Sequence, residues 1–464
     1  MPSSRRALLL TLVPPCVAGW AACGGGTDPP PPPENVLLVV LDDVGTRDVG
    51  TWGDPAAAPT PVLDGLVAEG MRFTEVWVSP VCSPSRASIL TGRHGTRTGV
   101  GVKVSPDDAY ELPEAEVTIA EALALSPRGY TSLAVGKWHL AGASDVTVPF
   151  DAPERQGFSA FAGSMGNLDL HSSAVDEPTD YFRWERCAEG ACAVTDRYAT
   201  TAVVDDALDL VADTPEPWFL YVAFNAAHAP YHAPPPGLNP DGVTADDSLR
   251  ARYDAMVSSV DAELGRLLDG LAPAVRARTT VVVIGDNGTP ETLANPPDSA
   301  ERVKGSVYEG GLRVPLVIAG PRVLQGGTRC DALVHGVDLL PTIAAIGGVS
   351  LDGWIRGDGL PVTLDGASLL PFLANPFAEG RKHLFTAFLR SNGAPPWPDA
   401  EYAVRDARFK LISIGGEEEL YEIVDGRDSG PELLSAGPLE SEAAEALVGL
   451  RDHLADALAV RFEN

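Results

Sequence analysis

The sequence predicts an α/β protein built on a large, mostly parallel or mixed sheet, and two observations carry this prediction. Residues 35–41 (NVLLVVL) form an uninterrupted apolar run rich in β-branched side chains, which is typical of a central strand buried on both faces. Similar short apolar runs alternate along the chain with stretches of helical periodicity. Such alternation favours strands that are covered by helices on both faces of the sheet.

The elements of this predicted domain follow one another up to about residue 350. After 35–41, strands are predicted at 72–78, 130–135, 218–224, 279–284 and 314–319. Helices are predicted between them at 61–68, 119–125, 197–212, 249–271 and 337–346. We assign residues 35–350 to one large domain. A single hydrophobic core does not extend over as many as 464 residues, so we also expect a second, smaller domain.

The pattern changes after about residue 360, and residues 351–464 are predicted to form a C-terminal α+β subdomain. Short strands with turn residues between them are predicted at 384–388, 401–404, 409–414 and 418–421. A long helical pattern follows at 440–460. This order predicts a small antiparallel sheet with a terminal helix.

The N-terminus predicts an exported protein. In residues 1–23, Arg5 and Arg6 precede an apolar run that is too short and too interrupted by proline to span a membrane, and two alanines precede Cys23. This pattern resembles a bacterial lipoprotein leader with lipid attachment at Cys23, followed by a Gly/Pro-rich tether at 24–34. Plain cleavage and secretion is the alternative. We expect a periplasmic or cell-surface protein whose only membrane contact is the N-terminal lipid.

The net charge excludes some classes of partner, and the cysteines indicate the cellular compartment. The chain has 34 basic and 64 acidic side chains, and its net charge of −30 argues against a nucleic-acid partner and against anionic lipid surfaces. An anionic substrate therefore needs a local basic pocket. Cys187 and Cys192 have a spacing that allows a disulfide in an oxidising compartment, whereas Cys330 is expected to be a small buried side chain.

The most informative stretch is Cys-Ser-Pro-Ser-Arg, which begins at Cys82 and is soon followed by Leu-Thr-Gly-Arg. Ser83 can cap a helix and Pro84 suits the first helical position, so we expect Cys82 just before a helix that ends at Gly92. A helix N-terminus favours a thiolate or a bound oxyanion, and Arg86 adds a cation. These residues alone predict a reactive cysteine or an anion pocket; a buried structural cysteine is the alternative.

Two predicted strands end in oxygen-bearing side chains. Asp42 and Asp43 follow the strand at 35–41, and Asp286 and Asn287 directly follow the strand at 279–284 and a glycine. Two adjacent carboxylates repel each other unless a cation neutralises them, and ligands of open α/β sheets gather at the carboxyl ends of the strands. Carboxylate and amide oxygens suit Ca²⁺ or Mg²⁺. Ordinary polar turns are the alternative.

Three further motifs follow or precede predicted strands. Lys137 and His139 lie in Gly-Lys-Trp-His-Leu, His228 lies in Asn-Ala-Ala-His-Ala-Pro, and Lys304 precedes a glycine-containing segment that leads into the strand at 314–319. Glycines permit close backbone approach, and the two lysines are candidate anion ligands. Taken singly, each motif could also be a surface loop with a hydrogen-bonded histidine or a free lysine.

Together, and in this order, these motifs resemble the formylglycine-dependent sulfatases, an arylsulfatase-like family of the alkaline-phosphatase-like superfamily. The resemblance covers roughly residues 35–346 and includes His-Gly-Val-Asp-Leu-Leu-Pro-Thr from His335. It implies that residues 35–350 are a sulfatase catalytic domain. Ala227 departs from the family pattern, because a proline commonly stands before the motif histidine.

The resemblance also implies a cofactor set. A formylglycine-generating enzyme would oxidise Cys82 to formylglycine, which makes that enzyme a partner of this chain. The resemblance further implies that a divalent cation, Ca²⁺ or Mg²⁺, is held by five residues: Asp42, Asp43, Asp286, Asn287 and the modified Cys82.

The catalytic roles come from the same resemblance. The hydrated aldehyde, assisted by Arg86, would attack the sulfur of a sulfate ester whose charge is held by Lys137 and Lys304. His228, together with Lys304, would bind the substrate and protonate the leaving oxygen, and His139 would remove the proton that lets sulfate depart.

The sequence leaves the substrate class open between a sulfated glycan and a small aryl sulfate. Two alternative functions remain at this stage. One is a phosphoester or phosphonate hydrolase of the same superfamily, because a metal and oxyanion pocket can serve either group. The other is a non-catalytic lipoprotein that binds sulfated glycans.

Overall fold

The central strand of the main sheet is β1 (Asn35–Leu41), in which every residue is buried. The computed structural model describes residues 34–52, 57–105, 110–142, 149–168, 179–296, 298–428 and 430–459. β1 pairs in parallel with β7 (Trp218–Ala223) and with β8 (Thr279–Gly285). The predicted leader and nearly all of the predicted tether lie outside the described residues.

Ten strands form this sheet, in the order β10-β2-β9-β8-β1-β7-β3-β4-β5-β6. β9 is antiparallel to both neighbours and β4, β5 and β6 pair antiparallel, whereas the other pairs are parallel. The predicted mixed α/β sheet is therefore confirmed. The remaining strands are β2 (Met71–Trp77), β3 (Thr131–Lys137), β4 (Ala160–Ser164), β5 (Trp184–Ala188), β6 (Ala191–Thr195), β9 (Leu316–Ala319) and β10 (Thr328–His335).

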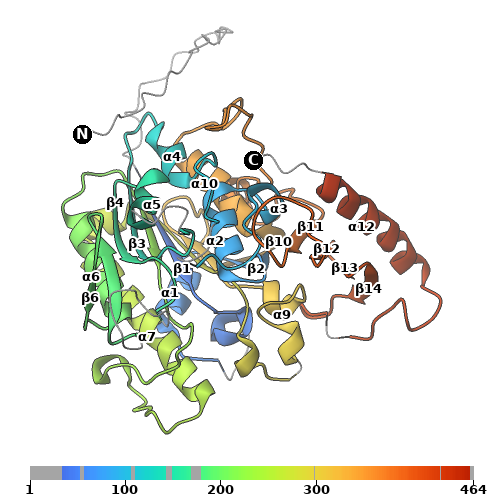
Figure 1. The fold of residues 1–464 in the computed structure, drawn as a ribbon, viewed down its shortest axis with the longest axis horizontal. Coiled ribbons are helices and arrows are strands. Elements are labelled where there is room, and N and C mark those ends of the chain that lie inside the picture. Colours follow the sequence, from blue (N-terminus) through green and yellow to red (C-terminus); the bar gives the residue numbers. More distant parts are fainter. Residues whose placement is uncertain are drawn as a thin grey trace. The chain divides into compact units, whose positions relative to one another are not determined.

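Helices cover both faces of the sheet (Figure 1). One face packs against α1 (Pro61–Glu69), α6 (Ala199–Ala212) and α7 (Leu249–Gly270). The opposite face packs against α2 (Cys82–Thr91), α4 (Ile119–Ala124) and α10 (Leu339–Ile346). The shorter helices are α3 (Gly95–Thr98), α5 (Ala152–Arg155), α8 (Pro273–Arg276), α9 (Glu309–Leu312) and α11 (Leu370–Ala374).

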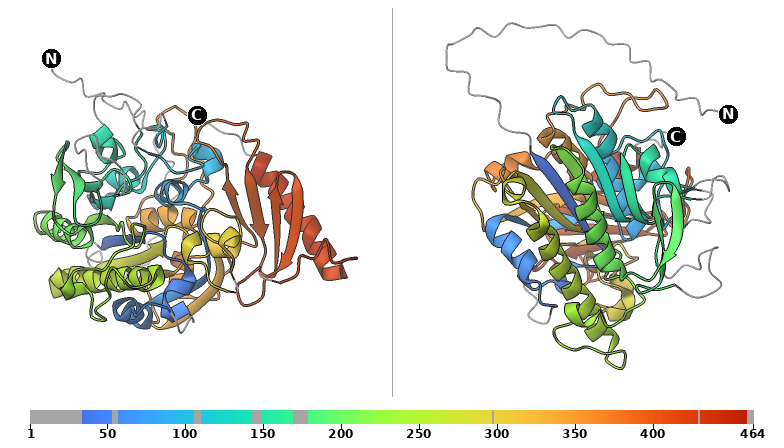
Figure 2. Two further views of the ribbon diagram at one scale, coloured as in Figure 1. Left: turned by 60° about the horizontal axis from the view of Figure 1, so that its bottom comes forward. Right: turned by 90° about the vertical axis from the view of Figure 1, so that its left-hand side faces the viewer.

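The C-terminal part forms a second sheet with a terminal helix, as predicted. Its four strands run antiparallel in chain order: β11 (Leu384–Phe388), β12 (Glu401–Arg405), β13 (Phe409–Ile414) and β14 (Glu417–Glu422). α12 (Ser441–Ala459) lies across one face of this sheet (Figure 2) and buries Leu447 and Leu450 in a small apolar core.

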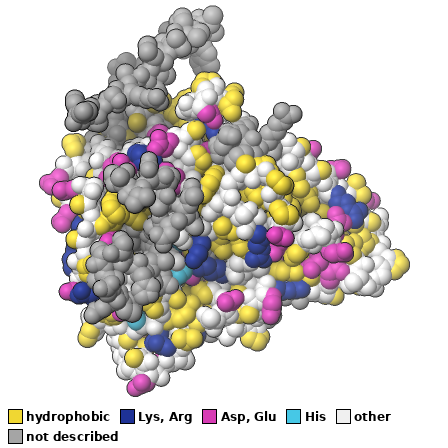
Figure 3. All heavy atoms as spheres, viewed as in Figure 1, with side chains coloured by type: hydrophobic (Ala, Val, Ile, Leu, Met, Phe, Trp, Pro, Cys, Tyr) yellow, Lys and Arg dark blue, Asp and Glu magenta, His cyan; other side chains and the backbone are white. Residues whose placement is uncertain are grey.

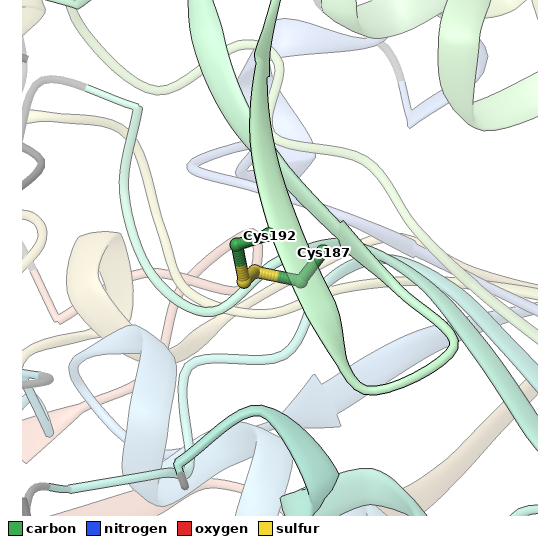
Figure 4. The surroundings of a disulfide bond; sticks show 2 residues. All are labelled: Cys187 and Cys192. Carbon is green, nitrogen blue, oxygen red and sulfur yellow. A yellow bond between two sulfur atoms is a disulfide. The ribbon is translucent and has the colours of Figure 1, made fainter. Parts of the chain in front are cut away.

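A disulfide joins the two strands at one end of the main sheet. Cys187 of β5 and Cys192 of β6 are directly paired across a hairpin, and their sulfur atoms are bonded (Figure 4). The four residues between them form the hairpin turn together with the ends of both strands. Cys330 is a free, buried cysteine, as expected.

The surface mixes charges of both signs. On the face shown in Figure 3, Lys and Arg side chains lie interspersed with Asp and Glu side chains. None of the helices in the described part of the chain has the length and apolar character that crossing a bilayer requires.

Candidate active site

The carboxyl ends of β1 and β8 bring the predicted oxygen ligands together. The backbone N–H of Asp286 donates to the carbonyl of Leu41 at 3.0 Å, and the N–H of Asp43 donates to Oδ1 of Asp286 at 3.1 Å. Asp42, Asp43, Asp286 and Asn287 are each at most 2% exposed. Parallel pairing with a shared strand end therefore places these four side chains at one buried point.

Cys82 lies beside these carboxylates, at the start of α2. Its Sγ is 3.5 Å from Oδ1 of Asp42 and 4.0 Å from Oδ1 of Asp43. The helix begins at Cys82 itself, with Val81 as the N-cap, so the predicted cap at Ser83 is wrong. The Ser83 hydroxyl instead accepts a hydrogen bond from the N–H of Val104 at 2.8 Å.

Three cations surround the carboxylates. Arg86 donates to Oδ2 of Asp286 through Nε at 3.1 Å and Nη2 at 2.8 Å, and its Nη1 donates to the carbonyl of Lys137 at 3.0 Å. The Nζ of Lys137 is hydrogen-bonded to Asp42. The Nζ of Lys304 is 2.5 Å from Oδ1 of Asp43. All three nitrogens of the Arg86 guanidinium are thus engaged, two of them on a single carboxylate oxygen.

The two predicted histidines border the same site. The Nδ1 of His228 lies 2.7 Å from the carbonyl of Ala229, which can only accept, so Nδ1 carries a proton; its Nε2 faces Oδ2 of Asp43 at 4.0 Å. His139 is 2% exposed, and its Nδ1 has no hydrogen-bond partner within the described residues. Burial and the charge of Lys137 lower the pKa of His139 well below its ordinary value.

Burial and opposing charges set the protonation states of the other groups. Burial lowers the pKa of His228 to about 4; the charge of Asp43 opposes this shift, and the charges of Lys304 and Lys137 add to it. Burial by itself would raise the pKa of Asp43, but Lys304 and the neighbouring cationic groups hold it well below its ordinary value. Burial and then the charge of Asp42 raise the pKa of Asp286 to about 6. These directions follow from the low dielectric of the site.

Cys82 is a neutral thiol in this setting. Burial first, and then the carboxylate of Asp286, raise the pKa of the Cys82 thiol. The helix terminus favours a thiolate or a bound oxyanion, but burial first, and the nearby carboxylates next, oppose ionisation of the unmodified residue.

The donor set fits a hard divalent cation. Ligand atoms of Asp42, Asp43, Cys82 and Asp286 all lie within 4.8 Å of one another, and all four residues are buried. The side-chain oxygen Oδ1 of Asn287 is also buried and lacks a hydrogen-bond partner among the residues described. An orphaned amide oxygen beside three carboxylates is the set that Ca²⁺ or Mg²⁺ prefers.

Comparison with known proteins identifies the family. A family model described as Sulfatase matches residues 34–349, and one described as N-sulphoglucosamine sulphohydrolase, C-terminal, matches residues 303–457. Human (Homo sapiens) arylsulfatase A is 31% identical over 409 residues, which cover 80% of this chain and 73% of the relative. The chain belongs to the sulfatase family. It is accordingly a sulfatase enzyme.

Solved structures agree with this fold. A structure of Ps i-CgsB in complex with k-i-k-neocarrahexaose has a TM-score of 0.74 at 23% identity and covers 93% of this sulfatase and 95% of its own chain. A structure of BT4656 in complex with its substrate D-glucosamine-2-N,6-O-disulfate has a TM-score of 0.68 at 20% identity and covers 92% and 98%. At these identities the likeness shows the fold alone.

Ala227, which stands where the family commonly has a proline, makes a hydrogen bond through its backbone N–H. The N–H of Ala227 donates to the carbonyl of Asp42 at 2.8 Å, and the N–H of Asp42 donates to the carbonyl of Ala226 at 3.3 Å. A proline at 227 would lack the first donor. The segment before His228 is therefore tied to the end of β1 by two main-chain hydrogen bonds.

Sequence reasoning missed two tyrosines that support the site. Tyr253 of α7 is fully buried, and its hydroxyl donates to the carbonyl of Asp43 at 2.7 Å. Tyr181 donates to the carbonyl of His228 at 2.7 Å. Both contact main-chain atoms. No side-chain motif marks such contacts, and an aromatic residue in an apolar stretch predicts core packing.

Proposed function

We propose that this sulfatase cleaves sulfate from organic sulfate esters with a formylglycine made from Cys82 and a bound Ca²⁺ or Mg²⁺. The observation that carries the proposal is the position of Cys82. It starts α2 within 4.8 Å of three buried carboxylates, and the lysines at 137 and 304 pair with two of them. A formylglycine-generating enzyme is the implied partner, because an ordinary thiol does not supply the required nucleophile.

Five residues would hold the cation: Asp42, Asp43, Asp286, Asn287 and the modified Cys82. Once bound, the cation supplies positive charge that polarises the sulfate and favours ionisation of the nucleophilic oxygen. Arg86 keeps Asp286 in place through its two hydrogen bonds and adds a fixed charge beside residue 82. A formylglycine at position 82 would, once hydrated, supply the oxygen that attacks sulfur.

Lys137 and Lys304 bind the sulfate group. Both ammonium groups already point into the carboxylate cluster, at Asp42 and Asp43 respectively. With a cation held at these carboxylates, both lysines would be free to donate to the oxygens of the substrate. Charge-assisted hydrogen bonds from fixed donors stabilise the charge that develops during attack.

The two histidines move the protons. His228 binds the substrate and, with Lys304, donates a proton to the ester oxygen; the negative charge of the bound sulfate ester favours the protonated ring needed for this step. His139, which is neutral because of its burial, accepts the proton whose removal releases sulfate and restores the aldehyde. Each proton therefore has a named donor or acceptor.

The substrate class is a sulfated glycan or an aryl sulfate. The relative named arylsulfatase A supports an aryl sulfate, and a human (Homo sapiens) relative named N-acetylgalactosamine-6-sulfatase, 30% identical over 369 residues, supports a sulfated sugar. We further propose export to the periplasm or cell surface, with lipid attachment at Cys23 as an optional anchor. The Cys187–Cys192 disulfide supports an oxidising compartment.

Mass spectrometry and one substitution test this function. The peptide that contains Cys82 should carry the aldehyde in active protein, and Cys82→Ala should abolish sulfate release from nitrophenyl sulfate. Cys330→Ala is the matched control, because Cys330 is also a free, buried cysteine. Full activity of Cys82→Ala would refute the mechanism, and faster turnover of nitrophenyl phosphate than of the sulfate would favour a phosphoester hydrolase.

A further inference from the structure

Tyr181 makes an unusual pair of contacts with the turn that carries His228. The tyrosine is 1% exposed, and its hydroxyl lies 2.6 Å from the carbonyl of Asn225 and 2.7 Å from the carbonyl of His228. Because a carbonyl only accepts, the single hydroxyl proton is shared between the two oxygens. One side chain therefore holds both ends of the turn.

The middle of that turn is held separately. Ala226 and Ala227 exchange main-chain hydrogen bonds with Asp42, at the carboxyl end of β1. The side-chain amide of Asn225 donates to the Ser164 hydroxyl at 2.9 Å. The turn is thus anchored to two strand ends, and the carbonyl of His228 is the part that Tyr181 fixes.

Tyr181 is itself held in place from two directions. Its carbonyl accepts a hydrogen bond from the N–H of Ala199, at the start of α6, at 2.8 Å. Its ring packs on the ring of His232, with centroids 4.4 Å apart. His232 is fixed in turn, because its Nδ1 lies 3.0 Å from the carbonyl of Pro230 and its Nε2 lies 3.0 Å from the Tyr198 hydroxyl. His232, which carries no sequence motif, acquires a packing role here.

The orientation of the His228 ring depends on this backbone. Its Nδ1 donates to the carbonyl of Ala229, which leaves Nε2 facing the site at 4.0 Å from Oδ2 of Asp43. The His228 carbonyl belongs to the peptide unit that joins His228 to Ala229. The carbonyl of Ala229, which accepts from the ring, lies on the next peptide unit and is joined to the first through the Cα of Ala229. A displacement of the first unit would therefore shift both this acceptor and the backbone from which the His228 ring projects, and would turn Nε2 away. Displacements of about 1 Å in positioned catalytic groups can lower rates by about a hundredfold.

We propose that Tyr181 is a positioning residue for His228, and that its hydroxyl keeps the ring aimed at the leaving oxygen of the substrate. The inference rests on the proposed function, in which His228 protonates that oxygen. Tyr181 acts through the backbone of the turn and need not touch the substrate. Loss of the Tyr181 hydroxyl should therefore lower kcat most for substrates whose leaving oxygen must be protonated.

The test compares leaving groups in Tyr181→Phe, made as the full chain with its aldehyde. The phenylalanine keeps the ring that packs on His232 and removes only the hydroxyl. The quantity measured is the ratio of kcat for a sugar 6-sulfate to kcat for nitrophenyl sulfate. Because both rates come from one preparation, the ratio is independent of the fraction of protein that is folded and carries the aldehyde.

Tyr130→Phe is the matched control. Tyr130 is also buried and also donates its hydroxyl to a main-chain carbonyl, that of Glu34, which directly precedes β1. The ratio should fall about three- to tenfold in Tyr181→Phe, which corresponds to one lost hydrogen bond, and should keep its wild-type value in Tyr130→Phe. KM for nitrophenyl sulfate should be unchanged in Tyr181→Phe.

Two outcomes would overturn the inference in distinguishable ways. A wild-type ratio in Tyr181→Phe, even with lower overall rates, would show a merely structural role, while the proposed function would stand. A wild-type ratio in His228→Ala, measured alongside, would remove the acid role of His228 and the inference that depends on it.

Discussion

The ammonium of Lys304 lies 2.5 Å from Oδ1 of Asp43, and the amide nitrogen of Asn287 donates to the same oxygen at 2.8 Å. Three separate chain segments thus meet at one carboxylate at the end of the central strand. The opposing charges hold the pKa of Asp43 well below its ordinary value, so this carboxylate is ionised at any physiological pH. A permanently charged oxygen at this point is what a hard cation requires.

Asp43→Ala and Asp286→Ala should each lower the divalent-ion content of the purified protein together with its turnover. Losing one carboxylate leaves the others repelling one another around a weakened cation. Removing a group that only hydrogen-bonds a metal ligand lowers metal affinity about 10- to 100-fold. Removing a ligand itself should lower it more. Elemental analysis and rates with nitrophenyl sulfate are the measurements.

Asp352→Ala is the control for these variants, because Asp352 is exposed and distant in sequence from the site. It should keep both metal and activity. Unchanged Ca²⁺ or Mg²⁺ stoichiometry in both Asp43→Ala and Asp286→Ala would refute the ligand assignment.

His228→Ala and His139→Ala should impair different steps of the reaction. Without an acid, sugar sulfates should lose about 10²- to 10⁴-fold in rate, whereas nitrophenyl sulfates, whose phenoxides leave with little help, should lose far less. His139→Ala should be slow with every leaving group and should gain the mass of one bound sulfate, because expulsion of sulfate is blocked. Rates over a substrate series and intact-protein mass decide the matter. A sulfate adduct in His228→Ala alone would reverse the two roles.

Buried central strands were predictable from sequence, and edge strands were not. β1 and β8 have continuous apolar sequences because both faces of each strand are covered, and they were located to within a residue. β6 has no buried residue, and β10, which includes Arg329 and Asp331, is the last strand at the other end of the sheet. Strands in such positions need no uninterrupted apolar run, so β6 and β10 were missed. β4 and β5 have neighbours on both sides but were also missed, because their short sequences, AFAGS and WERCA, are not runs of large apolar side chains.

The same distinction applies to the site. Asp42 and Asp286 were predicted to meet because parallel strands bring their carboxyl ends to one edge. The start of α2 was misplaced because Ser83 matches a cap by residue type, while its hydroxyl actually bonds Val104. Tyr181 escaped prediction because its partners are main-chain carbonyls, which every residue possesses.

Lys410→Met should destabilise the protein without touching the site. Lys410 of β13 is fully buried, and its Nζ lies 3.2 Å from Oε1 of Glu309 and 2.8 Å from Oδ2 of Asp428. Removing one member of a buried charge network leaves the others uncompensated, so the free energy of unfolding should fall by about 3–5 kcal/mol. Urea denaturation measures this change. The exposed Lys382→Met should be nearly neutral, and an equally small effect at Lys410 would mean that the network contributes little.

His94 should make stability depend on pH. Burial lowers the pKa of His94 from the ordinary 6.5 to about 4; the negative charge of Asp365 opposes this shift, and the positive charges of Arg381 and Arg97 add to it. The folded protein therefore binds this proton less readily than the unfolded chain. The stability that His94 contributes is complete above pH 6.5 and is lost as the pH falls toward 4, by about 3 kcal/mol over the whole window.

His94→Phe should flatten this dependence. The new ring would keep the edge contacts with His335 and Phe385, whose centroids lie 4.7 and 5.2 Å from that of His94. A cavity of about 440 Å³ beside residue 94 leaves room for the larger side chain. Urea denaturation of both proteins at pH 7 and pH 4.5 should show a smaller loss of stability for the variant. His335 also resists protonation, so some dependence should remain. Identical losses in the two proteins would show that His94 is not the group that titrates.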